Sequence, residues 1–138
     1  MRYLLDTDTC INIIRKRTEV LLRRLFEQTP GEVGVSSITV AELAYGVQRS
    51  EHVQQNRDAL EKFLLPLAVL SFDEPAAAAY GVLRAELEAV GLPIGGMDTL
   101  IGAHALALGA TLVTSNVREF SRIRSLRVED WLVAPDQA

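Results

Sequence analysis

The sequence contains very little cysteine and histidine, and this shortage excludes several classes of protein. Its one cysteine, Cys10, cannot form an internal disulfide or a cysteine-based zinc site. The two histidines, His52 and His104, lie far apart in unrelated contexts, and no Gly-x-Ser-x-Gly segment is present. We therefore do not expect a disulfide-stabilised scaffold, a zinc finger or a Ser-His-Asp hydrolase.

Long hydrophobic runs are also absent. No apolar stretch approaches the roughly 18 residues that a membrane span needs, and Asp6 interrupts the start before the core of a signal peptide could form. We expect a cytoplasmic protein with no membrane partner. A chain of 138 residues that is 49% hydrophobic and 23% charged has enough apolar material for one core, so we predict a single domain over residues 1–138.

The net charge of −4 argues against a protein that coats nucleic acid generally. Many of the basic residues nevertheless fall into two short stretches, which are either phosphate-binding patches or solvated helix faces. The first basic stretch contains Arg15, Lys16, Arg17, Arg23 and Arg24, and the second contains Arg118, Arg122, Arg124 and Arg127.

Short apolar runs rich in Val, Leu, Ile and Thr predict strands, and their continuous apolarity is typical of a parallel sheet covered on both faces. The predicted strands are Tyr3 to Asp6, Val33 to Ser36, Ala68 to Phe72 and Thr111 to Thr114, with a weaker fifth around Val128 to Trp131. Segments whose apolar residues follow helical spacing lie between these predicted strands. The predicted helices include one that begins near Asp8, one over residues 20–26 that stops before Pro30, one around residues 52–65, one over residues 76–90 between Asp73 and Gly91, and one over residues 97–108 closed by Gly109.

Three acids stand where predicted strands and helices meet. Asp6 ends the first strand, Glu42 lies just after the second strand, and Asp98 opens the helix that contains His104. In an open α/β sheet, ligands bind outside the carboxyl ends of the strands. Acids that converge there repel one another unless a cation lies between them, and carboxylate oxygens are ligands that Mg²⁺ and Mn²⁺ prefer.

Each acid also has a purely structural interpretation. Asp6 suits the cap of the helix near Asp8, and Thr39-x-x-Glu42 matches a capping box. Asp98 suits the first turn of a helix, where the helix dipole keeps a carboxylate ionised. From the residues alone, the structural and functional interpretations stay open.

Other polar residues favour structural roles. His104 falls on the apolar face of its helix, as a hydrogen-bonded core histidine does, and Cys10 stands among isoleucines as a small buried hydrophobe. Arg84 follows Tyr80 by one turn and precedes Glu88, which is typical of a surface ion pair.

Four segments, taken in order, resemble the PIN-domain ribonucleases and, more narrowly, the VapC toxins of bacterial toxin–antitoxin pairs. They are Leu4 to Asp8, Ile38 to Gly46, Gly95 to Ala105 and Val113 to Phe120, and the likeness runs from residue 2 to about Trp131. The resemblance implies a PIN-like α/β fold, with a mostly parallel, four- to five-stranded central sheet flanked by helices. It also implies an endoribonuclease that hydrolyses RNA with Mg²⁺, for which Mn²⁺ can substitute.

Carried over by position, the resemblance makes Asp6, Glu42 and Asp98 the catalytic and metal-binding acids. Where many relatives have a fourth acid, this chain has Asn116 and then Glu119, and we favour Asn116 as the further metal ligand because it lies nearer the strand end. The residues expected to contact substrate phosphates are Thr114, Ser115, Asn116 and Arg118. The implied partners are RNA, a small VapB-type antitoxin that inserts into the acidic groove, and a second copy of the chain in a homodimer or hetero-oligomer.

Two other functions compete with this prediction. One is a PIN-like binding module without catalysis, in which Asn116 marks a degraded site; the presence of all three principal acids argues against it. The other is a phosphoacceptor domain of the response-regulator type. That class needs a lysine after its last strand, and the only lysines here are Lys16 and Lys62.

Overall fold

The computed structural model describes residues 1–16 and 18–133. Arg17 of the first basic stretch, and residues 134–138 of the predicted domain, lie outside the described residues. The described part forms a central sheet with helices on both sides. The strands are β1 (Tyr3–Leu5), β2 (Val33–Ser36), β3 (Ala68–Leu70), β4 (Thr111–Val113) and β5 (Val128–Glu129). The helices are α1 (Thr7–Ile14), α2 (Glu19–Phe26), α3 (Ser37–Arg49), α4 (Val53–Leu64), α5 (Glu74–Ala89), α6 (Gly96–Leu108) and α7 (Val117–Phe120).

The five strands are all parallel, in the order β3-β2-β1-β4-β5. This arrangement confirms the predicted α/β fold with a parallel sheet, including its weak fifth strand. β1 lies in the centre, with β2 on one side and β4 on the other. The carboxyl ends of these three strands therefore share one edge of the sheet, and α1, α3 and the segment before α7 leave from it.

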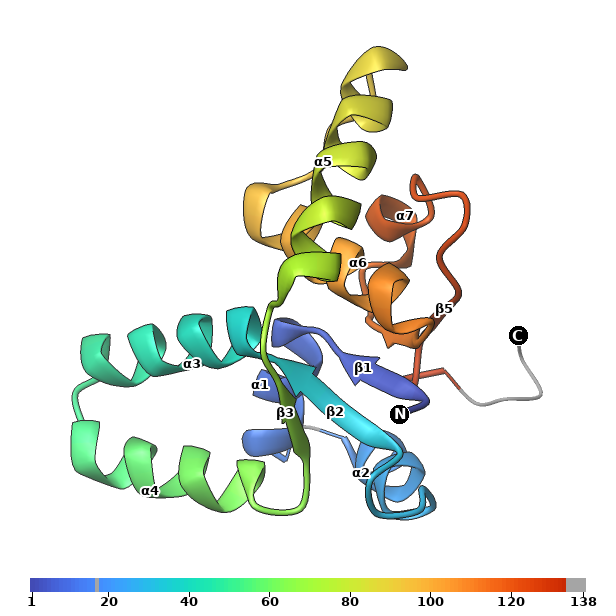
Figure 1. The fold of residues 1–138 in the computed structure, drawn as a ribbon. Coiled ribbons are helices and arrows are strands. Elements are labelled where there is room, and N and C mark those ends of the chain that lie inside the picture. Colours follow the sequence, from blue (N-terminus) through green and yellow to red (C-terminus); the bar gives the residue numbers. More distant parts are fainter. Residues whose placement is uncertain (17, 134–138) are drawn as a thin grey trace.

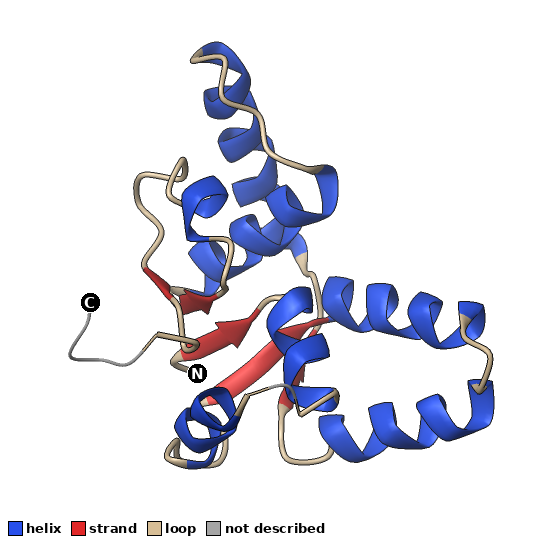
Figure 2. Cartoon of the chain, turned by 180° about the vertical axis from the view of Figure 1, so that it is seen from behind, coloured by secondary structure: helices blue, strands red, loops and turns tan. Residues whose placement is uncertain are grey.

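The helices cover the two faces of the sheet as separate layers. Figure 1 shows α5, α6 and α7 on one side and α1 to α4 on the other, and the view from behind in Figure 2 agrees. Alternate strand residues serve the two faces: Leu4 belongs to the core under α5 and α6, whereas Tyr3 and Leu5 belong to the core under α1 to α4. Trp131 packs edge-on against Tyr3, with ring centroids 5.1 Å apart.

Several strands are shorter than predicted because a side chain or loop contact diverts the chain. β1 ends at Leu5, one residue before its predicted end, because Asp6 caps α1. The Asp6 side chain accepts a hydrogen bond from the Thr9 amide. After β3, the Phe72 amide donates to Ser37 Oγ instead of extending the strand. β4 ends at Val113 and β5 at Glu129, also earlier than predicted.

Helix boundaries follow the predicted signals more closely. Asp73 caps α5 by accepting from the Ala76 amide, and α6 ends at Gly109, whose φ of 66° is the left-handed conformation that glycine adopts without strain. The capping box considered as an alternative at Thr39 does not form. α3 begins at Ser37, and the cap is Ser36, whose side chain accepts from the Ile38 amide.

None of the helices in residues 1–16 and 18–133 has the length and apolar character that a membrane crossing requires.

Candidate functional site

Asp6 is a buried acid at the end of the central strand. Only 3% of its surface is exposed, and its Oδ1 accepts from the Thr9 amide at 2.8 Å. Burial raises the pKa of the Asp6 carboxyl, while hydrogen bonds from Thr114 and Thr9 oppose the rise. The predicted capping role is therefore confirmed, and the same side chain remains a buried carboxylate at the sheet edge.

Glu42 reaches the same edge from α3. Its Oε1 accepts from Thr7 Oγ1 at 2.6 Å, and that hydroxyl lies 3.2 Å from Thr39 Oγ1. The bond joins α3 to the first residue of α1, directly after Asp6. Glu42 is thus held by a residue 35 positions away instead of by its own helix cap, which is why the capping-box interpretation fails.

Asp98 lies in the first turn of α6, where several other acids affect the pKa of its carboxyl. Burial raises its pKa to about 6, and the negative charges of Glu119, Asp6, Glu42 and Asp8 add to the rise, in that order. The helix dipole was expected to keep this carboxylate ionised, and here burial and like charges outweigh it. Asp98, Glu119, Asp6, Asp8 and Glu42 therefore lie close enough for their charges to interact at this edge of the sheet, which is called the acidic edge below.

Glu119 and Asn116 form a bonded pair beside Asp98. Glu119 accepts from the Gly95 amide at 3.0 Å and from Asn116 Nδ2 at 2.9 Å, and these bonds lower the pKa of its carboxyl. A Cβ built on Gly95 would lie 3.7 Å from Asp98 Oδ2 and 4.0 Å from Glu119 Oε1. Both acids therefore lie close to Gly95, and Glu119 ties the start of α6 to α7.

The residues expected to contact substrate phosphates differ in accessibility. Ser115 and Arg118 are exposed and Asn116 is half-buried. Thr114 is fully buried, and its Oγ1 accepts from the Asn116 amide at 3.0 Å while it also bonds Asp6. Thr114 therefore orients Asp6 and does not face the solvent from which a phosphate would arrive.

The basic stretches contribute partly to the fold. Arg24 bonds the Val133 carbonyl and lies 3.5 Å from Glu129, while Arg122 donates to the Pro93 carbonyl. Arg127 donates to the Gly109 carbonyl. These arginines are engaged as structural donors, whereas Arg118 is exposed in α7, next in sequence to Glu119.

The oxygen donors suit a hard divalent cation in their chemistry, since they are carboxylates whose mutual repulsion a cation would relieve. In the described side-chain positions, however, no group of three or more Asp, Glu, His or Cys residues could hold a metal ion. Thr7, Thr9 and Gly95 instead satisfy carboxylate oxygens of Glu42, Asp6 and Glu119. Ligation therefore requires side-chain rotation or bridging waters, several of which Mg²⁺ usually keeps.

Sequence reasoning missed the residues that hold these acids. Thr7 and Thr9 position Glu42 and Asp6, and the Ser36 hydroxyl lies 2.8 Å from His104 Nδ1. The signal available was local: hydroxyl residues directly next to each acid or strand end. His104, Cys10 and Arg84 take their predicted structural roles, the first two buried and the third paired with Glu88 at 3.1 Å.

Comparison with known proteins supports the predicted family. Residues 3–126 match the model of the PIN domain. Ribonuclease VapC2 of Haemophilus influenzae is 43% identical over 132 residues, covering 96% of this chain and 99% of the relative. The tRNA(fMet)-specific endonuclease VapC of Salmonella typhimurium is 40% identical over 131 residues, covering 95% and 98%.

Solved structures give the same picture. VapBC2 from Rickettsia felis, bound to a DNA fragment from its promoter, superimposes with a TM-score of 0.89 at 41% identity, covering 95% of this chain and 99% of that one. DNA-bound VapBC from Salmonella typhimurium superimposes with a TM-score of 0.90 at 40% identity, covering 95% and 98%.

Proposed function

Since the chain belongs to the PIN-domain family and, within it, to the VapC ribonuclease toxins, we propose that its acidic edge hydrolyses RNA phosphodiesters with the help of Mg²⁺. The observation that carries this proposal is the placement of Asp6, Glu42, Asp98 and Glu119 at one edge of the sheet, and burial and the charges of these acids raise the pKa of Asp98 to about 6 there. Such a cluster is costly without a cation and is typical of a site that binds one.

Asp6 and Asp98 would hold the metal ion, with Glu42 near it. When bound, Mg²⁺ would make an attacking water more acidic and offset the charge that develops on the phosphate. Glu42 accepts from Thr7 through Oε1 and keeps Oε2 to orient that water and take its proton. Thr9 and Thr114 fix the orientation of Asp6.

We assign the fourth charge of the site to Glu119 in preference to Asn116. Glu119 is the acid that raises the pKa of Asp98 most, whereas Asn116 turns its amide nitrogen toward Glu119. Glu119→Gln should therefore weaken Mn²⁺ binding and RNA cleavage together, and Asn116→Ala should weaken them less. If Asn116→Ala costs more metal affinity than Glu119→Gln, the assignment is reversed.

Initiator tRNA is the first substrate to test, because relatives that are 40% and 38% identical carry the name tRNA(fMet)-specific endonuclease. The parent chain, freed of any antitoxin, should cut it with Mg²⁺ and not with EDTA. Asp98→Asn should lose most of this activity, on the order of a hundredfold or more. Asp58→Asn on exposed α4 is the matched control and should cut normally.

The competing binding module predicts something different. If the chain is such a module, it binds RNA but does not cleave it in the presence of Mg²⁺.

The solved relatives are complexes with a VapB partner, which supports a small antitoxin as the partner of this chain as well. Adding the cognate antitoxin should abolish the cleavage.

A further inference from the structure

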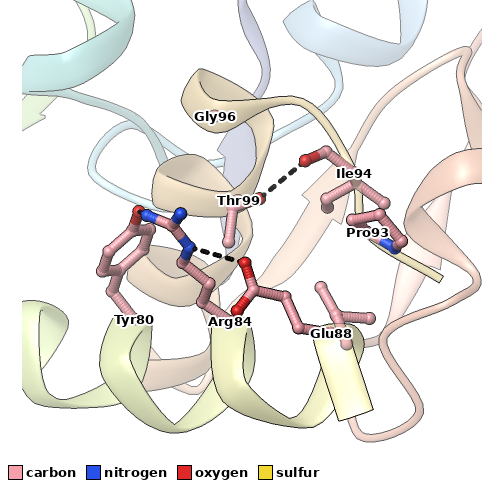
Figure 3. A pocket seen from close by; sticks show the side chains of 8 residues that line it. Tyr80, Arg84, Glu88, Pro93, Ile94, Gly96 and Thr99 are labelled. Carbon is pink, nitrogen blue, oxygen red and sulfur yellow. Dashed lines mark hydrogen bonds and ion pairs between the residues drawn. The ribbon is translucent and has the colours of Figure 1, made fainter. Parts of the chain in front are cut away.

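A cavity of about 240 Å³ opens between α5 and the start of α6 (Figure 3). Its volume is below the roughly 300 Å³ at which drug-sized pockets begin, and suits one small planar ring system. The residues that line it are Tyr80, Arg84, Leu87, Glu88, Pro93, Ile94, Gly96 and Thr99. None of them is one of the acids Asp6, Glu42, Asp98 and Glu119 of the acidic edge.

The polar side chains of this cavity are organised as a chain of contacts. The Arg84 Nη1 donates to the Tyr80 hydroxyl at 3.0 Å, and the Arg84 Nε donates to Glu88 Oε2 at 3.1 Å. Figure 3 shows the guanidinium between the phenol ring and the carboxylate. The cavity thus combines a flat aromatic ring, a flat cation and a carboxylate acceptor, while Pro93 and Ile94 add apolar surface.

The cavity shares the first turn of α6 with the acidic edge. Gly96 and Thr99 belong to the first turn of α6, which also carries Asp98. Gly95, whose Cβ would be 3.7 Å from Asp98 Oδ2, directly precedes that turn. A Cβ built on Gly96 would meet nothing within 4 Å, so the space beside this cavity-lining residue is open.

We propose that this cavity, called the base cavity below, binds one unstacked base of the RNA strand, next to the phosphodiester that the acidic edge cuts. The proposal rests on the proposed ribonuclease function. Bases of single-stranded RNA are recognised by stacking on aromatic rings or arginine planes and by hydrogen bonds to their edges. Tyr80 and Arg84 supply the stacking surfaces, and Glu88 Oε1, free of the Arg84 bond, accepts from the N–H groups of a base edge.

The chain offers a matched control for the aromatic ring. Tyr45 on α3 is 63% exposed and also precedes an arginine by four residues, with the Arg49 guanidinium 5.4 Å from its ring centre. This second pair lines neither the base cavity nor the acidic edge as described. Tyr80→Leu and Tyr45→Leu therefore remove the same group, without changing charge, at two different places.

The test measures binding without catalysis. Fluorescein-labelled single-stranded RNA homopolymers of each base are titrated into the chain in EDTA, and fluorescence anisotropy gives the dissociation constants. Tyr80→Leu should weaken binding on the order of tenfold, the effect of losing one stacked base, while Tyr45→Leu should bind within about twofold of the parent. Glu88→Gln should change the order of preference among the four homopolymers, and Glu86→Gln on the same helix should not.

The failures are distinguishable. A parent that does not cut RNA in Mg²⁺ overturns the ribonuclease function, whatever the binding data show. A parent that cuts RNA but binds the homopolymers equally well with and without the Tyr80 ring overturns the base cavity alone, as does an equal loss in Tyr45→Leu. Should Tyr80→Leu not fold, the exposed Glu88→Gln decides, and an unchanged order of preference overturns the inference.

Discussion

At the scale of single residues, Asp98 shows how a local preference loses to its surroundings. The first turn of a helix favours a negative charge by about 0.3–1 kcal/mol at an exposed site. Here burial and four neighbouring acids act in the opposite direction and raise the pKa of Asp98 to about 6. A carboxyl in this state is held at a free-energy cost, which the fold tolerates where a ligand offsets it.

This cost makes the metal-free protein sensitive to pH. The pKa of Asp98 rises from 3.8 to about 6 on folding, so the folded state holds that proton more tightly. Its stabilising contribution is complete below pH 4 and is lost as the pH rises through 6. At pH 7 in EDTA, Asp98→Asn should therefore raise the free energy of unfolding by about 1 kcal/mol, after allowance for solvent screening, and the gain should vanish at pH 4.

Urea unfolding at the two pH values measures this difference. Asp58→Asn, on the exposed surface of α4, should follow the parent at both values. A gain in Asp98→Asn that stays the same at pH 4 and pH 7 would show that its carboxyl titrates normally and that the acids do not interact.

At the scale of elements, the buried contact between Ser36 and His104 joins the helices that carry Glu42 and Asp98. Ser36 caps α3 through its hydroxyl, which also lies 2.8 Å from His104 Nδ1 on α6. Burial lowers the pKa of His104, which favours the neutral ring, and an edge-on contact with Phe72 positions the ring further. The contact therefore sets how α3 and α6 approach the acidic edge together.

Ser36→Ala should cost about 2–3 kcal/mol of unfolding free energy. The loss combines a helix cap, worth about 1 kcal/mol, with an unpaired buried ring nitrogen, which costs about 1–3 kcal/mol. Ser50→Ala is the control at the other end of α3, where the hydroxyl bonds only the Val47 carbonyl and is half-buried. Denaturant melts in which both variants lose the same stability would contradict the special role of the Ser36 bond.

Elements were predictable from the sequence where their signals are local. The Asp73 cap and the Gly109 stop each depend on one side chain or one backbone conformation, and both were recognised. The start of α3 was not, because Ser36, Ser37 and Thr39 are all residues that can cap a helix. Long-range contacts distinguish them, since Ser36 bonds His104, 68 positions away, and Ser37 accepts from the Phe72 amide.

The site shows the same limit. The positions of Asp6, Glu42 and Asp98 at the ends or starts of elements follow from the sequence. Their convergence depends on β1 lying between β2 and β4, and that order is a long-range pairing that no local pattern encodes. The role of Thr7 could not be predicted for the same reason, since Thr7 bonds an acid on another helix, whereas the bond from the Thr9 amide to Asp6 is local.

At the scale of the whole molecule, the sheet holds two hydrophobic cores together and keeps the acids at one edge. Leu4 and Leu112 pack under α5 and α6, and Leu5 and Val113 pack under α1 to α4. Because the central strands contribute residues to both cores, a ligand bound at their carboxyl ends stabilises both cores together. Metal binding at the acidic edge should therefore appear in the melting temperature of the whole domain.

Mn²⁺ at a hundredfold excess over its dissociation constant should stabilise the folded state by about 2.7 kcal/mol, which for a domain of this size raises the melting temperature on the order of 10 °C. Asp98→Asn and Glu119→Gln should show much smaller rises, because each removes a charge from the site. Glu61→Gln, exposed on α4, should keep the full rise. Thermal melts by circular dichroism at increasing Mn²⁺, each compared with the same variant in EDTA, give the result. Equal rises in the parent and Asp98→Asn would remove Asp98 from the metal site, and equal rises in all four proteins would place the ion somewhere other than the acidic edge.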